Sequence, residues 1–277
     1  MKSSVTISLV PESAGGPFVF SGNLADGFAR AARHGFDAVE IFPTSADTLD
    51  AAEIKSLCNR HGLKIAAMGS GGGWVKHKLR LTDPDGTVRQ WAAEFIGGIV
   101  DLAGKFGAPT IVGSMQGTWG AGVPREQSLR WLAEALEELG DRAETHGVPV
   151  LYEFLNRYET NLFNRVDESL EFLQTLRTRN IKLLCDLFHM NIEEPDISAA
   201  LKLAGAKVGH IHFADSNRRA IGMGHTPMKP IVAALREIGY EGYLSAEVFP
   251  LPDQDEAAAR SVASFRELVG PGREAHA

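Results

Sequence analysis

Four ligand-type side chains stand at the ends of four apolar segments in the second half of the chain. Each segment closes on a polar residue, in Leu-Tyr-Glu153, Leu-Cys-Asp186, His-Ile-His212 and Ser-Ala-Glu247. An unpaired buried carboxylate is very costly, so such groups need an ionic partner or a metal ion. Three carboxylates and one imidazole form an oxygen-rich set that suits Mn²⁺, Mg²⁺ or Co²⁺ better than structural zinc. These residues predict a site for one divalent metal ion, with Mn²⁺ the preferred ion.

Strand alternation indicates the direction of two of these side chains. In the last segment Glu247 lies on the face opposite three apolar residues that suit a side covered by helices, Leu244, Ala246 and Val248. Glu247 is therefore expected to point into a barrel. His212 lies nearer than His210 to the carboxyl end of its segment, where the active sites of such barrels are built. The alternative is four unrelated roles, such as a salt-bridged Glu or a helix-capping Asp, and the shared position at four strand ends favours the metal site.

A regular alternation of strands and helices is expected to hold these side chains. Runs rich in β-branched residues recur at 5–10, 38–42, 64–70, 110–115, 149–154, 181–188, 208–215 and 242–249. Between them apolar residues recur every three or four positions, as in Leu129, Leu132, Leu136 and Leu139. Glycine follows five helical stretches, where a left-handed cap ends a helix, at Gly35, Gly62, Gly107, Gly147 and Gly239. Eight such units predict an α/β fold, a (β/α)8 TIM barrel that forms a single domain over residues 1–277.

Composition and charge argue against several classes of protein. The chain is 44% hydrophobic and 23% charged, which is typical of a globular protein, and its net charge of −7 disfavours a nucleic-acid groove. The two cysteines, Cys58 and Cys185, show no CxxC spacing. The first residues lack the apolar stretch of a secretion signal, and no window approaches the roughly 18 apolar residues of a membrane span. We expect a cytoplasmic protein with no nucleic-acid or membrane partner.

Polar residues that follow the same strands are candidates for substrate contacts. Glu159 follows the fifth strand, His189 follows Asp186 by three residues, and Arg218 follows the seventh strand. The other readings of these residues are a histidine at a helix start or in the core, and an arginine in a solvated loop.

Two further loops bear on the substrate and on assembly. The glycine-rich run 69–73 lacks the Lys-Ser/Thr of a P-loop, so we expect a flexible loop at the barrel mouth. With Lys76 and Arg80 nearby, it could hold a phosphate or form a solvated rim. Two apolar residues expected to be exposed on loops, Trp119 and Phe163, suggest a homo-oligomer, either a dimer or a tetramer.

In its second half the chain resembles the xylose-isomerase-like barrel superfamily of sugar isomerases and epimerases, and most of all its D-tagatose 3-epimerase group, the ketose 3-epimerases. The matching stretches are Glu153-Phe-Leu-Asn-Arg-Tyr-Glu159, Cys-Asp186-Leu-Phe-His189, His210-Ile-His212 and Ala-Glu247-Val-Phe249. The resemblance implies that the metal ligands are Glu153, Asp186, His212 and Glu247. It also implies that Glu153 and Glu247 are the acid/base pair, and that the substrate's oxygens are held by Glu159, His189 and Arg218.

Two stretches depart from that group. Phe154 stands where proline often follows the first ligand, and Asp215-Ser216 stands where a Gly-Glu pair is usual. The identity of the sugar and the epimerised carbon therefore stay open at this point.

The resemblance implies metal-assisted C3 epimerisation of a ketose through an enediolate, in which one glutamate removes the C3 proton and the other returns one to the opposite face. Alternatives with the same ligands are a hydroxypyruvate isomerase-like or inosose dehydratase-like enzyme, or an inactive sugar-binding barrel. A DNA-repair endonuclease of this barrel type would need more histidine ligands and a basic face. Only nine histidines and a net charge of −7 argue against it.

Overall fold

The computed structural model describes residues 1–120 and 122–270, and its centre is a closed sheet of parallel strands. The sheet runs in the order β1 (Lys2–Ser8), β3 (Ala38–Phe42), β4 (Lys64–Gly69), β5 (Thr110–Val112), β6 (Val150–Glu153), β7 (Ile181–Asp186), β8 (Val208–His212) and β9 (Tyr243–Ala246). β9 pairs back onto β1, with Tyr243 opposite Lys2, and this pairing closes the barrel. A short strand, β2 (Phe20–Ser21), pairs with the carboxyl end of β1, at Ile7 and Ser8. The predicted (β/α)8 barrel is confirmed.

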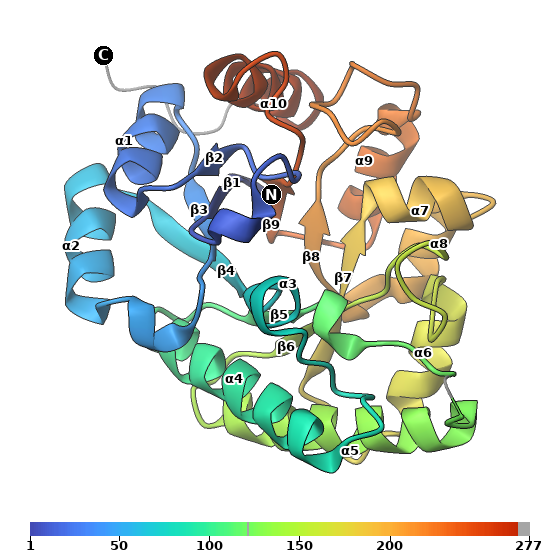
Figure 1. Cartoon of the computed structure of the whole chain (residues 1–277). Coiled ribbons are helices and arrows are strands. Elements are labelled where there is room, and N and C mark those ends of the chain that lie inside the picture. Colours follow the sequence, from blue (N-terminus) through green and yellow to red (C-terminus); the bar gives the residue numbers. More distant parts are fainter. Residues whose placement is uncertain (121, 271–277) are drawn as a thin grey trace.

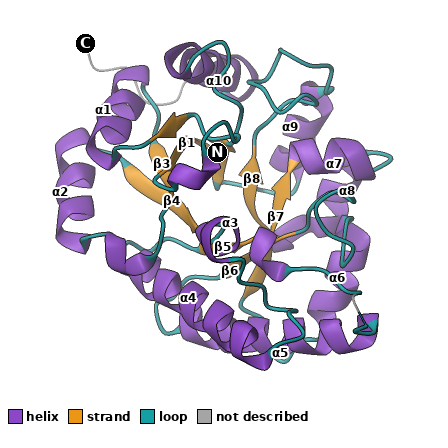
Figure 2. Cartoon of the chain, in the orientation of Figure 1, coloured by secondary structure: helices purple, strands orange, loops and turns teal. Residues whose placement is uncertain are grey.

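Helices surround the sheet, as Figures 1 and 2 show. The outer ring consists of α1 (Leu24–His34), α2 (Ala51–His61), α4 (Gly86–Gly104), α5 (Arg125–Glu144), α6 (Val166–Thr175), α8 (Ile197–Ala204), α9 (Met228–Glu237) and α10 (Gln254–Val269). Two shorter helices follow strand ends at the barrel mouth, α3 (Gly72–His77) and α7 (Leu187–Glu193). Single 3-10 turns complete the elements at η1 (Pro11–Ser13), η2 (Ala46–Thr48), η3 (Ser114–Gln116) and η4 (Gly205–Lys207). Within the described ranges, no helix is both long and apolar enough to cross a membrane.

The predicted glycine caps explain where several helices stop. The five glycines adopt φ angles between 62° and 82°, in the left-handed region that L side chains avoid, at Gly35, Gly62, Gly107, Gly147 and Gly239. At Gly35, for example, the backbone N–H donates to Ala31 and Ala32 carbonyls and closes α1. The cap prediction is confirmed.

Side chains alternate along the strands between the layer that faces the helices and the inside of the barrel. Side chains that face the helices are apolar, such as Val5 and Ile7 of β1 and Leu183 of β7. The opposite face of the strands carries a small apolar cluster of Phe42, Ala67, Ile111, Leu151 and Leu184. On the same face other buried residues are polar, namely Ser4, Thr6, Glu40, His210, His212 and Ser245. Burying ionisable groups inside the barrel costs folding free energy, so these groups must be paired with one another or with a ligand.

The prediction of a flexible loop over residues 69–73 is wrong. β4 ends at Gly69, and α3 begins at Gly72. The glycines serve close packing instead, because a Cβ on Gly72 would lie 2.5 Å from the Pro43 carbonyl oxygen. A Cβ on Gly73 would lie 2.5 Å from Met115 Sδ. Sequence composition alone does not separate a glycine needed for close approach from one that gives freedom.

Two other expectations need correction. The sixth expected segment, 181–188, was too long, because the chain turns into α7 directly after Asp186. Phe163 is not an exposed loop residue, since it is only 4% exposed and stacks on Phe172 with ring centroids 4.7 Å apart. Trp119 does lie at the surface, with 40% of its area exposed. Of the two residues that suggested a homo-oligomer, only Trp119 is therefore exposed.

Candidate metal centre and substrate pocket

The four predicted metal ligands lie together at the carboxyl end of the barrel. Glu153 ends β6, Asp186 ends β7, His212 ends β8, and Glu247 directly follows β9. One ligand atom from each residue lies within 4.8 Å of the others, and all four residues are buried. The Nδ1 atom of His212 is 3.1 Å from Glu153 Oε1 and 3.5 Å from Glu247 Oε2. Asp186 Oδ2 lies 3.7 Å from the same nitrogen.

Two buried atoms of this cluster, Asp186 Oδ2 and His212 Nδ1, have no hydrogen-bond partner of good geometry in the part of the chain that is described. Asp186 does cap a helix, because its Oδ1 accepts from the Phe188 backbone N–H at 2.8 Å. The capping role and a ligand role therefore use different oxygens of one carboxylate. Orphaned buried polar atoms are rare and call for a missing partner. Together with the donor types, they fit a divalent cation.

Negative charge exceeds positive charge around this cluster. Burial raises the pKa of Glu153 to about 7. Burial alone would lower the pKa of His212, but the carboxylates of Glu247 and Glu40 raise this pKa well above its usual value. In the metal-free protein, protons therefore partly fulfil the neutralising role of a cation.

Metal affinity is expected to rise with pH between about 6 and 8, because a cation must displace protons held by Glu153 and His212. Both pKa values are raised, so these protons are present below them and are lost as pH increases. Calorimetric titration with Mn²⁺ in buffers of different ionisation enthalpy measures both the affinity and the protons released. An affinity that stays constant over this range, with no proton release, would contradict the assignment.

Gly113, directly after β5, leaves the space that the Glu153 carboxylate occupies. A Cβ at this position would lie 2.3 Å from Glu153 Oε2. We therefore expect Gly113→Ala to displace the carboxylate and to lower Mn²⁺ affinity and turnover, by up to about 10²-fold for a shift near 1 Å. Gly98→Ala is the control, because the nearest neighbour of a Cβ at Gly98 is Ala46 Cβ of η2, at 3.4 Å and far from the cluster in sequence. Equal Mn²⁺ titrations for Gly113→Ala and the unaltered chain would show that this space is not needed.

His189 is presented to the pocket in one tautomer. Asn156 Nδ2 lies 2.7 Å from His189 Nδ1 and donates to Glu159 Oε1 at 3.0 Å, while Asn156 Oδ1 accepts from the Tyr158 backbone N–H. These partners orient the amide, so His189 Nδ1 must accept a hydrogen bond. Burial lowers the pKa of His189 to about 4, which keeps the ring neutral at pH 7. Its single proton is therefore on Nε2, which lies 3.4 Å from Asp186 Oδ2 and can donate to a substrate oxygen.

Arg218 is delivered by a tightly held loop in which it adopts a left-handed φ of 56°. The Asp215 carboxylate organises this loop by accepting from the backbone N–H groups of Ser216, Gly222, Gly224 and Thr226. The guanidinium lies over the Phe188 ring, and its Nη2 donates to Glu247 Oε2 at 2.6 Å. Its Nη1 lies 3.7 Å from Glu159 Oε1. Arg218 thus connects one candidate metal ligand, Glu247, to a candidate substrate-binding residue, Glu159.

A cavity of about 310 Å³ opens over the cluster. It is lined by Glu153, Glu247, Glu159, His189 and Arg218, and its outer wall contains Phe18, Phe42, Trp74, Ser8, Ser70 and Ser114. Among the described residues that line it, Arg218 is the only arginine or lysine. Lys76 and Lys78 are exposed and do not line the cavity, while Arg80 forms an ion pair with Asp83. These three basic residues therefore do not line the cavity.

Sequence reasoning missed several polar residues that support the centre. Glu40 of β3 is completely buried and contacts both His210 and His212. Gln116 donates from its side-chain Nε2 to the Glu153 and Gly113 carbonyl oxygens, which holds the ends of β5 and β6 together. A signal for Glu40 was available, because a single carboxylate in the apolar run Ala-Val-Glu40-Ile-Phe carries the same burial cost as Glu153. No comparable signal marks Gln116, which lies in a turn.

The fold is a parallel barrel with a buried cluster that could hold a metal ion, and comparison with known proteins specifies its family. Residues 28–268 match the family described as xylose isomerase-like TIM barrel, and the chain belongs to this family. It is 30% identical over 228 residues to a D-psicose 3-epimerase of Ruminiclostridium cellulolyticum, covering 79% of this chain and 76% of that protein. It is 29% identical over 266 residues to an L-ribulose 3-epimerase of Methylomonas sp., covering 93% and 91% of the two chains.

A solved structure of 3-keto-D-glucoside 4-epimerase from Escherichia coli superposes with a TM-score of 0.82 over 96% of this chain and 100% of that one. Its sequence is 21% identical, so this likeness concerns the fold.

Proposed function

We propose that the protein is a divalent-metal-dependent 3-epimerase of free keto-sugars, with Mn²⁺ as its working ion. The observation that carries this proposal is the pair Glu153 and Glu247, which reach into one cavity from the ends of two non-adjacent strands. Beside them lie two buried potential ligand atoms without a hydrogen-bond partner among the described residues, Asp186 Oδ2 and His212 Nδ1. Metal ligation is assigned to Glu153, Asp186, His212 and Glu247. The names of the two related epimerases support the same reaction class.

The mechanism uses two carboxylates on opposite sides of a bound ketose. When bound, the cation supplies positive charge that makes the proton next to the C2 carbonyl more acidic and stabilises the negative charge that develops. Glu153 removes the C3 proton from one face, and Glu247 delivers a proton to the other. The Arg218 guanidinium, 2.6 Å from Glu247 Oε2, orients the second carboxylate.

Three further residues are proposed to hold the sugar. The neutral His189 ring offers its Nε2–H to the carbonyl side of the substrate. Glu159 accepts from hydroxyl groups and Arg218 donates to them, since both line the same cavity. The outer wall offers hydroxyls and aromatic faces but no second cationic side chain among its described residues, which favours a free sugar over a sugar phosphate.

A panel of substrates assayed with Mn²⁺ tests the proposal. It contains free ketoses, their phosphates, hydroxypyruvate, an inosose and a 3-keto-glycoside. Turnover of a free ketose to its C3 epimer is the expected result. Activity confined to hydroxypyruvate or an inosose would assign one of the other reactions of this family. Binding of a ketose without turnover would instead indicate a sugar-binding barrel.

We further propose that the protein forms a homo-oligomer, a dimer or tetramer, and works in the cytoplasm. Trp119 and Tyr158 support self-association, because they are 40% and 81% exposed on loops that meet through Trp119–Asn161 hydrogen bonds. Cys58 and Cys185 are both free thiols, which suits a reducing compartment.

A further inference from the structure

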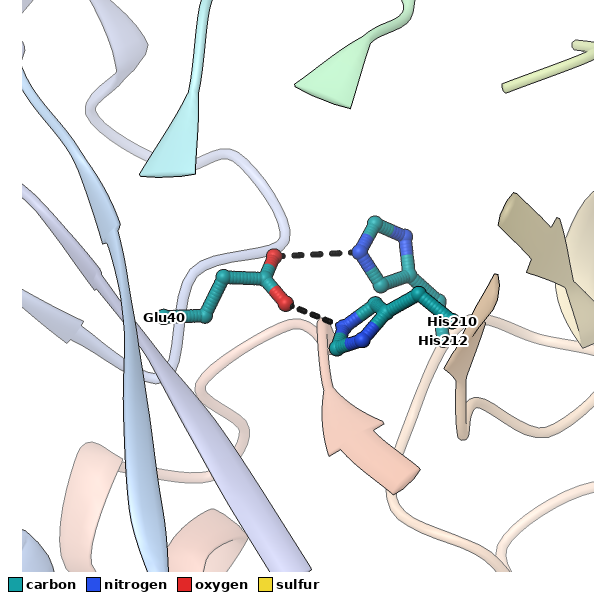
Figure 3. Close-up of side chains that lie close together, drawn as sticks. All are labelled: Glu40, His210 and His212. Atoms are coloured by element: carbon teal, nitrogen blue, oxygen red, sulfur yellow. Dashed lines mark hydrogen bonds and ion pairs between the residues drawn. The ribbon is translucent and has the colours of Figure 1, made fainter. Parts of the chain in front are cut away.

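Glu40 is clamped by two histidines deep in the barrel, as Figure 3 shows. It comes from β3, whereas His210 and His212 come from β8, and these strands are not neighbours in the sheet. Glu40 Oε2 lies 2.6 Å from His210 Nε2, and Oε1 lies 3.0 Å from His212 Nε2. All three side chains are at most 1% exposed. Each carboxylate oxygen therefore has its own imidazole donor, without competition from water.

This contact has a consequence for the other nitrogen of His212. A carboxylate only accepts hydrogen bonds, so the Nε2 atom of His212 must carry a hydrogen. A neutral ring with its proton on Nε2 presents a lone pair at Nδ1. That Nδ1 atom is the one that faces Glu153, Asp186 and Glu247 without a hydrogen-bond partner of good geometry among the described residues. Glu40 and the ligand cluster thus use opposite edges of one ring.

We propose that Glu40 is a positioning residue of the metal centre, which fixes the orientation and the Nε2–H tautomer of His212 so that Nδ1 serves as the metal ligand. This inference rests on the metal centre of the proposed function and adds a residue from the opposite side of the barrel. His210 has a supporting part, because its Nε2–H holds the second oxygen of Glu40 and stops the carboxylate from rotating. A carboxylate in this role also makes the imidazole a stronger ligand.

A second metal site made of Glu40, His210 and His212 is the competing interpretation, since these residues could together hold an ion. The distances argue against it. Both histidine Nε2 atoms already lie at hydrogen-bond distance from Glu40, at 2.6 and 3.0 Å, so hydrogens fill the positions a cation would need. A purely structural role, in which Glu40 only stabilises the barrel, is the other possibility that an experiment must separate.

Glu40→Gln is the variant that tests the proposal. Glutamine keeps the volume but exchanges one acceptor oxygen for a donor NH₂, so it can accept from only one of the two histidines. We expect its affinity for Mn²⁺ to fall by about 10–100-fold, the range that loss of such outer partners produces. The affinity is measured from the electron paramagnetic resonance signal of free Mn²⁺, which requires no turnover. Ser4→Ala is the matched control, because Ser4 is also buried in the barrel and contributes no ligand, and it should leave the affinity unchanged.

A second measurement uses the unaltered protein and so does not depend on the folding of a variant. Long-range ¹⁵N–¹H NMR of the Mg²⁺-loaded protein should show His212 with its proton on Nε2. A proton on Nδ1 would overturn the proposal.

The remaining outcomes are also decisive. An unchanged Mn²⁺ affinity in Glu40→Gln, accompanied only by a lower melting temperature of the metal-free protein, would establish a structural role. Binding of two Mn²⁺ ions per chain, reduced to one in Glu40→Gln, would establish the second metal site. If the unaltered chain bound no Mn²⁺, the proposed function itself would fail, which is a different result from failure of the role of Glu40.

Discussion

Glu153→Gln and Glu247→Gln are each expected to lower kcat for the preferred ketose by about 10²–10⁴-fold, the contribution of a positioned acid/base group. Glutamine has nearly the same shape but cannot take up or deliver the proton. The two variants should fail differently, because exchange of the C3 proton from one epimer needs the base on that face. Solvent deuterium incorporation at C3, followed separately from each epimer, measures this difference.

Both glutamates are also proposed as metal ligands, so the metal must be controlled in this experiment. Each variant is assayed at Mn²⁺ concentrations that saturate it, as established by titration, so that the loss in kcat reports proton transfer. Glu94→Gln makes the same chemical change on the outer side of α4, where Glu94 contacts only Gln90 in the hydrogen bonds described, and should leave kcat unaltered. Full exchange retained by both Glu153→Gln and Glu247→Gln would exclude the two-base mechanism.

Removal of the metal is expected to abolish turnover and to lower the melting temperature by about 5 °C. A ligand present at one hundred times its Kd stabilises the folded state by about 2.7 kcal/mol. In a chain of this size each kcal/mol shifts the melting temperature by roughly 2 °C. The physical reason is the surplus of buried carboxylates around Asp186 and His212, whose orphaned atoms acquire a partner when a cation binds.

Calorimetric melting with a chelator, and then with Mn²⁺ restored, measures this shift. Asp186→Asn provides a comparison, because asparagine keeps an oxygen that can cap α7 but removes the charge that faces the cluster. Its melting temperature should respond much less to Mn²⁺ than that of the unaltered protein. Identical melting with and without saturating Mn²⁺ would contradict a metal centre at this position.

The sequence was sufficient for those parts of the structure that follow from local chemistry. β-branched runs and helix-capping glycines such as Gly35 carry their own conformational preferences, so the order of strands and helices could be predicted. The four residues of the cluster could be predicted to meet because each breaks an apolar strand at the same end. Burial makes such an interruption expensive, whatever the family.

Other features depend on contacts between distant parts of the chain, and these could not be predicted. The glycines of α3 leave space for Pro43 and Met115, which belong to other units of the barrel. The pairing of Glu40 with His212 joins two residues that lie 172 positions apart in sequence. Asp186 shows a different limit. The sequence offered helix cap and metal ligand as alternatives, but one side chain can serve as both.

The most direct test of the central claim is the position of deuterium after turnover of a free ketose by the Mn²⁺-loaded protein in D₂O. Epimerisation through the two glutamates predicts one deuterium at C3 of the product epimer, detected by loss of its ¹H NMR signal, with none at C1 or C4. Deuterium at C1 alone would indicate aldose–ketose isomerisation, and deuterium at C4 would move the reaction to the next carbon. Deuterium at C1 alone, deuterium at C4, or a product without deuterium would each contradict the proposed C3 epimerisation.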